Sequence, residues 1–121
     1  MDDKLYQVIL KLLDKTTSSK VNWEDASRLS EGEKFRVSLG EAIVEVWDGE
    51  ISYPTDDGDF IHEKKYDARV LNAYGLIVAQ QEFTLKMGLP YWNVEKLFLA
   101  ARSSARRSDV VLDNLLQKLG A

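Results

Sequence analysis

The stretch that decides the fold is KFRVSLGEAIVEVW, residues 34–47. Apolar and polar residues alternate on both sides of Gly40 and Glu41, which is the pattern of two half-buried strands joined by a tight turn. Glycine as the first of two turn residues suits a type II′ hairpin. That turn pairs six apolar side chains on one face, which we predict to be the core face: Leu39 with Ala42, Val37 with Val44, and Phe35 with Val46.

The opposite face of this hairpin supports the same register. Arg36 falls opposite Glu45, an opposite-charge pair across the strands. Trp47 falls opposite Lys34 on this face, with Ile43 nearby. Two interpretations of Trp47 stay open at this point: a helix covers the face, or Trp47 belongs to an exposed apolar patch that binds a partner.

Helical periodicity flanks the hairpin toward both ends of the chain. Residues 3–16 are predicted to form an amphipathic helix through Leu5, Val8, Ile9, Leu12 and Leu13. A second helix is predicted to begin near Pro90 or Asn93, with Val94, Leu97, Phe98, Ala101 and Ala105 on one stripe. A final helix is expected over about 109–119, with Ser108 as its N-cap and an apolar stripe of Val111, Leu112, Leu115, Leu116 and Leu119.

The remaining segments complete the predicted fold. Residues 21–33 look irregular, with Trp23 as an anchor, and residues 48–63 look like a long polar connection. A second hairpin is predicted from residues 65–72 and 76–83, with NAYG at 72–75 as its turn. We therefore predict a single α+β domain over residues 1–121, with an N-terminal helix, a four-stranded antiparallel sheet made of two hairpins, and two C-terminal helices.

Composition narrows the class of protein. The chain has 121 residues, 45% hydrophobic and 30% charged, and these values are typical of a globular domain. It has no cysteine, which excludes disulfides, thiolate metal sites and cysteine nucleophiles. We expect a cytoplasmic protein with no membrane partner, because the N-terminus starts with two acids rather than a basic signal and no apolar run is long enough to span a membrane.

Three arginines, Arg102, Arg106 and Arg107, lie between the two C-terminal helices. Arg102 and Arg106 are four residues apart and share a helix face, as a phosphate site requires. No aromatic residue is interleaved with them, no glycine-rich loop precedes them, and the net charge of −4 opposes nucleic-acid binding. We expect a solvated joint between two helices; an acidic protein partner, the chain's own acidic loop and nucleic acid are the alternatives.

Acidic residues gather in the polar connection. Residues 48–59 carry a charge of −5, with Asp56, Asp57 and Asp59 closest together. Their spacing does not match a calcium-binding loop, although a weak divalent-ion site stays open. His62 is the only histidine, and Asp57, Asp59 and Glu63 lie near it in sequence, but no serine lies in a nucleophile-elbow context. We expect no catalytic residue, no metal and no cofactor.

Several segments together resemble a loosely defined group of small bacterial proteins of unknown function. They are KVNWEDAS, FRVSLGEAIVEV, the hairpin with NAYG, LFLAARSSA and VLDNLLQKL, which cover most of the chain from about Lys20 onward. These motifs are packing patterns rather than catalytic signatures, so the resemblance implies no activity.

The sequence thus favours a non-enzymatic module that binds another protein or a second copy of itself. Asp56, Asp57, Asp59, Arg102, Arg106, Arg107 and Trp47 are the candidate partner-binding residues. Two alternatives remain: a nucleic-acid-associated factor that uses the arginines at 102–107, and an enzyme that uses His62 with nearby carboxylates.

Overall fold

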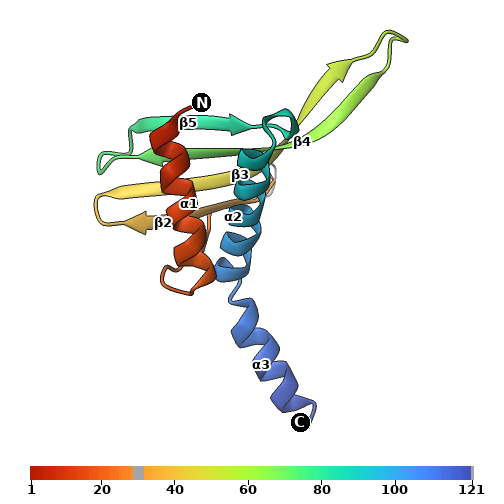
Figure 1. The fold of residues 1–121 in the computed structure, drawn as a ribbon. Helices are drawn as coiled ribbons and strands as arrows, with labels where there is room; N and C mark the ends of the chain where they lie inside the picture. The colour runs from red at the N-terminus through yellow and green to blue at the C-terminus, as the bar shows by residue number, and fades with distance from the viewer. Residues whose placement is uncertain (29–31, 121) are drawn as a thin grey trace.

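The computed structural model describes residues 1–28 and 32–120, and these form three α-helices and one antiparallel sheet (Figure 1). The elements follow in the order α1 (Asp3–Thr17), β1 (Glu24–Asp25), β2 (Lys34–Leu39), β3 (Ala42–Pro54), β4 (Phe60–Leu71), β5 (Ile77–Phe83), a 3-10 turn η1 (Leu85–Met87), α2 (Leu89–Ala105) and α3 (Ser108–Lys118). Within those ranges the sheet has five strands, in the order β1-β2-β3-β4-β5. The α+β class is confirmed, and the predicted count of four strands is wrong.

The β2–β3 hairpin has the predicted register. Leu39 pairs with Ala42, Val37 with Val44 and Phe35 with Val46. Gly40 has φ of +61° and Glu41 stays outside the left-handed region, as a type II′ turn requires. Phe35, Val37, Val44 and Val46 are buried, but Leu39 at the end of the strand is 38% exposed. The core therefore ends one residue short of the turn.

The predicted polar connection over residues 48–63 is wrong. β3 continues to Pro54 and β4 begins at Phe60, with paired residues from Ile43↔Leu71 out to Pro54↔Phe60. Only residues 55–59 form the turn, where Thr55 donates its backbone N–H to Asp59 and Gly58 has φ of +82°. The two predicted hairpins are thus parts of one continuous meander, because β3 pairs with β4 as well as with β2.

The fifth strand, β1, lies in the segment predicted to be irregular. It is two residues long, and Glu24 and Asp25 pair with Arg36 and Phe35 of β2. Next to it, Trp23 is the buried anchor that the sequence predicts, with 4% of its surface exposed. Its indole N–H donates to the hydroxyl of Thr16 at 2.9 Å. This contact ties the segment after α1 to the core.

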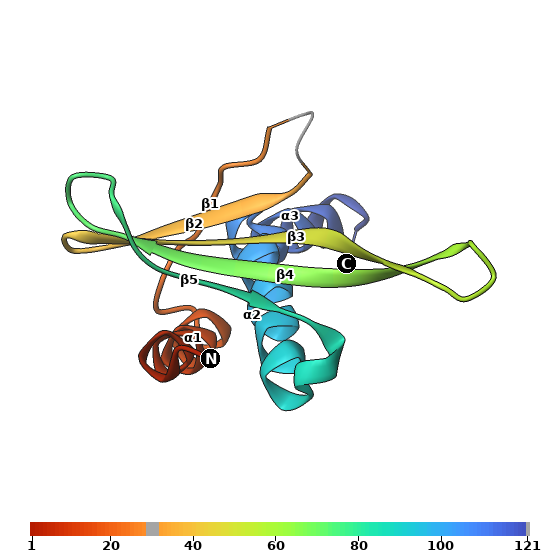
Figure 2. The ribbon, with the colours of Figure 1, turned by 90° about the horizontal axis from the view of Figure 1, so that it is seen from above.

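Both α1 and α2 lie on the same side of the sheet (Figure 2). Leu5, Ile9 and Leu12 of α1 are buried, whereas Val8 is 37% exposed. The rings of Phe35 and Tyr66 on the sheet pack against Phe98 of α2, with centroids 5.4 and 5.2 Å apart. The core therefore fills the space between one sheet face and the two helices.

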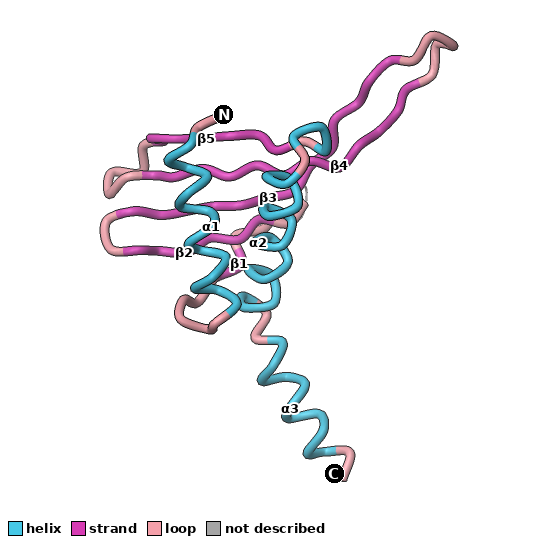
Figure 3. The backbone as a smooth tube through the Cα atoms, in the orientation of Figure 1, coloured by secondary structure: helices cyan, strands magenta, loops and turns pink. Residues whose placement is uncertain are grey.

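The last helix, α3, leaves the body of the molecule beyond α2 (Figures 1 and 3). Arg107, with φ of +51°, is the residue before its first turn and makes no side-chain cap. The predicted N-cap Ser108 is instead the first residue of α3, so that expectation is wrong. None of the helices in residues 1–28 and 32–120 combines the length and the apolar character needed to cross a membrane.

Candidate functional site

The strongest candidate surface is the part of the β3–β4 hairpin that extends past the rest of the sheet, residues 48–65, which we call the arm. β3 pairs with β2 only as far as Trp47, and β4 pairs with β5 only from Tyr66 onward. Beyond these points the two strands pair only with each other among the described residues. Figure 1 shows the arm as a ribbon that points away from α1 and α2.

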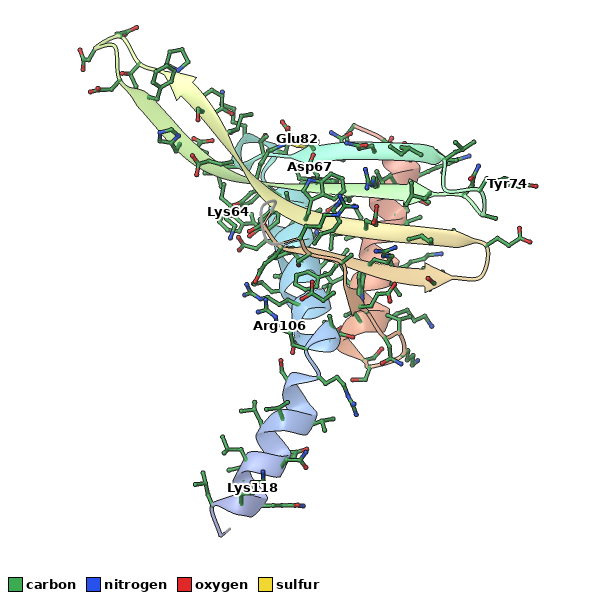
Figure 4. All side chains as sticks on the ribbon, turned by 180° about the vertical axis from the view of Figure 1, so that it is seen from behind. Lys64, Asp67, Tyr74, Glu82, Arg106 and Lys118 are labelled. Atoms are coloured by element: carbon green, nitrogen blue, oxygen red, sulfur yellow. The ribbon has the colours of Figure 1, made fainter. Side chains whose placement is uncertain are left out.

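The arm is acidic. It contains six acidic residues and two lysines, so its formal charge is −4, which equals the formal charge of the whole chain. The remaining residues are therefore neutral in sum. Asp56, Asp57 and Asp59 are exposed in the turn at its tip, as the sequence predicts for residues that meet solvent or a partner. The projecting side chains are visible in Figure 4.

Apolar side chains lie next to this acidic tip. Phe60 is 61% exposed and Ile61 is 54% exposed, although both are large. Tyr53 pairs with Ile61 across the strands, and the ammonium of Lys86 lies 4.9 Å from the Tyr53 ring. The arm thus combines negative charge with aromatic surface, a combination that suits contact with a protein.

His62 lies on the arm, where its Nδ1 is 2.8 Å from the Glu50 carboxylate and 2.8 Å from the Ser52 hydroxyl. A nucleophile relay needs serine on one ring nitrogen and the acid on the other. Here both groups contact the same nitrogen, so the geometry is not that of a relay. Asp57, Asp59 and Glu63, which the sequence places near His62, are not its contacts among the described residues.

A divalent-ion site is the other chemistry that the sequence leaves open for this acidic region. Within residues 1–28 and 32–120, no three His, Cys, Asp or Glu side chains are grouped so that they could hold a metal ion.

Two of the three arginines in the joint form ion pairs with a glutamate of the same chain. Arg102 donates to one oxygen of Glu33 at 3.0 Å, and Arg106 donates to the other oxygen. Burial opposes ionisation of Glu33, but the hydrogen bonds from Arg106 and Arg102 outweigh it and lower its pKa. Arg107 does not join this cluster; it borders a hollow between the end of α1 and α2.

Trp47 is half-buried on the sheet face opposite α1 and α2. No described helix covers that face, so the interpretation that a helix shields Trp47 is wrong. Instead the cationic groups of Lys34 and Arg69 lie 5.2 and 5.0 Å from the centre of its ring. Arg69 also donates to Glu45 at 2.6 Å.

Charges on this face alternate across the strands. Arg36 and Arg69 flank Glu45, and Glu24 lies 3.4 Å from Arg36. Lys65 contacts Asp67 at 3.0 Å and Glu82 at 2.8 Å, and the Glu82 hydrogen bond is the main reason that the pKa of Lys65 is raised. Cations paired in this way present little net positive charge, which weakens the face as a phosphate-binding surface.

The structure does not bring the predicted site residues together. Arg106 lies beside the joint that precedes α3, whereas the arm projects from the opposite end of the molecule (Figure 4). Trp47 lies on the sheet at the base of the arm, where the pairing of β2 with β3 ends. Sequence reasoning missed Glu33 because its partners are 69 and 73 residues away.

Comparison with known proteins gives no match: no family model, no curated protein and no solved structure is similar to this chain. The resemblance to small bacterial proteins stays a prediction.

Proposed function

We propose that this protein is a non-enzymatic binding module and that the arm contacts a basic surface of another protein. The observation that carries the proposal is the arm itself. Its strands extend past the sheet, and its side chains contribute nothing to the buried core among the described residues. A two-stranded hairpin is only marginally stable in water, so an extension of this kind adds little to the stability of the domain, and this favours a role in contact.

The chemistry of the arm specifies the kind of surface it fits. A charge of −4 in 18 residues attracts a basic segment, and it increases the rate of encounter with such a partner. Tyr53, Phe60 and Ile61 supply the apolar contact that charge alone does not provide. Among the described residues no further strand pairs with either outer edge of the arm, and an extended peptide can pair with an exposed edge of this kind.

Capture of partners from a lysate of the native source, with and without nuclease, tests this proposal. The variant Asp56→Lys/Asp57→Lys reverses two charges at the tip, and we expect it to weaken partner binding at least about tenfold. The matched control is Asp3→Lys/Asp14→Lys, which changes the net charge equally at exposed positions outside the arm. We expect the control to bind like the wild type.

The outcomes separate the classes of function. A protein that co-purifies in both halves and is lost only from the tip variant supports the proposal. Equal loss from both variants indicates a response to net charge, and capture that nuclease abolishes indicates a nucleic-acid partner. Either result contradicts the assignment of the arm.

A further inference from the structure

The apolar stripe of α3 is exposed. Val111, Leu112, Leu115, Leu116 and Leu119, which we call the α3 stripe, are between 49% and 74% exposed. Val110 borders the hollow between α1 and α2, and at 100° per residue it lies on the opposite side of the helix from Leu115 and Leu119. The side of α3 nearest the body is therefore the side of Val110, and no residue in the described part of the chain covers the stripe.

A second apolar surface lies at the end of the sheet away from the arm (Figure 1). The β2–β3 and β4–β5 turns enclose a hollow of about 340 Å³, which we call the end groove. Leu39, Ala42 and Val70 line it from the sheet face that packs against the helices, and Val78, 61% exposed, borders it. Neither α1 nor α2 contributes a lining residue. The helix layer thus stops short of this end of the sheet.

The α1 helix lies between α2 and the β2–β3 and β4–β5 turns (Figure 1), and its side away from α2 is a basic flank. Tyr6 faces α2, since its hydroxyl accepts a hydrogen bond from Asn93 at 2.7 Å. Val8 lies about 160° around the helix from Tyr6, on the flank away from α2. Lys4, Lys11 and Lys15 share that flank, all three are exposed, and none forms an ion pair with another described residue.

We propose that the α3 stripe of one copy docks into the end groove of a second copy, and that the exchange is reciprocal. An amphipathic helix laid into an apolar groove is a common mode of recognition. Asp113 borders the α3 stripe on one side, and its carboxylate complements the basic flank of α1 beside the groove. A two-fold dimer satisfies both surfaces of both chains at once.

The second copy, rather than the same chain, supplies the groove. Only Arg107 separates the first residue of α3 from the C-cap of α2, and α1 lies between α2 and the end groove (Figure 1). A helix held by so short a joint does not reach across α1. Pairing of two α3 stripes alone involves five side chains from each chain, far fewer than the roughly 20 residues a side of a standard interface. Reciprocal docking adds the groove of each chain to that surface.

Engineered cysteines test the proposal cleanly, because the chain has none of its own. Leu115→Cys and Leu39→Cys are made as separate proteins, mixed and oxidised. We expect a disulfide between the two different chains, at a yield at least tenfold above that of the control pair Asn114→Cys with Leu39→Cys, in which Asn114 lies on the polar face of α3. Self-linked Leu115→Cys as the main product overturns the proposal, because it means that two α3 helices pair together.

Molecular mass in solution supplies a second readout. We expect the wild type to be a dimer at tens of micromolar, and Leu112→Asp/Leu116→Asp to be a monomer with unchanged circular dichroism. The control Asn114→Asp/Gln117→Asp adds the same charge on the polar face and is expected to remain a dimer. A monomeric wild type overturns the proposal, as does a single chain bearing both Leu39→Cys and Leu115→Cys that closes a disulfide within itself.

Discussion

Glu33 joins distant parts of the described chain through charge, because its ion-pair partners are 69 and 73 residues away. Its two carboxylate oxygens accept hydrogen bonds from Arg102 and Arg106, so it holds the end of α2 against the strand that starts at Lys34. The Arg102 and Arg106 guanidiniums also lie over the rings of Phe98 and Phe35. Two of the three arginines that the sequence offers as a phosphate site are therefore part of the packing of the domain.

Glu33→Gln is expected to lower the free energy of unfolding at pH 7 by about 1 kcal/mol, the scale of partly exposed ion pairs. The folded-state pKa of Glu33 lies below its ordinary value of 4.5. Its stabilising effect is thus present above pH 4.5 and is lost as the pH falls through the lowered pKa. Urea unfolding from pH 7 to pH 3 measures this: the difference between wild type and variant should shrink below pH 4.5. A difference that stays constant down to pH 3 would show that the charge of Glu33 is irrelevant.

At the scale of elements, the arm and the β2–β3 hairpin differ in the interactions that stabilise them. The hairpin has Phe35, Val37, Val44 and Val46 in the core, whereas the arm relies on its own strand pairing and on exposed contacts such as His62 with Glu50. Local opening therefore costs less free energy in the arm.

Hydrogen exchange measures this difference directly. We expect hydrogen-bonded amides in residues 50–63 to be protected at least about a hundredfold less than those in residues 35–46. Partner binding should raise the protection of the arm and leave the hairpin unchanged. Equal protection in the isolated protein would mean that the arm opens only when the whole domain unfolds.

The same contrast explains what the sequence predicts well. Register in residues 34–47 is predictable because both faces are constrained, one by the core and one by Arg36 opposite Glu45. In residues 48–63 no side chain enters the core, so the alternation of apolar and polar residues that marks a strand is weak there. The two residues of β1 are too few to produce any pattern.

For the whole molecule, the sequence predicts which helix faces are apolar but not which of them the fold covers. The stripe of α2 is buried through Val94, Leu97, Phe98 and Ala101, whereas the stripe of α3 stays exposed although α3 is the more amphipathic helix. The difference arises at Arg107, whose left-handed conformation turns α3 away from the sheet. No property of the α3 residues themselves sets that direction. Asp56, Asp57 and Asp59 are exposed at the tip of the arm, but the wide separation of the candidate residues depends on the tertiary fold.

Photocrosslinking from the arm measures whether the arm contacts another protein. A photoreactive phenylalanine analogue replaces Phe60 on the arm or, as the control, Ser38 on the opposite end of the sheet; both positions are exposed. In cells of the native source, we expect a protein adduct from position 60 that is absent from position 38 and is lost in the Asp56→Lys/Asp57→Lys background. The same adducts from both positions, or an adduct from position 60 that persists in that background, would contradict it.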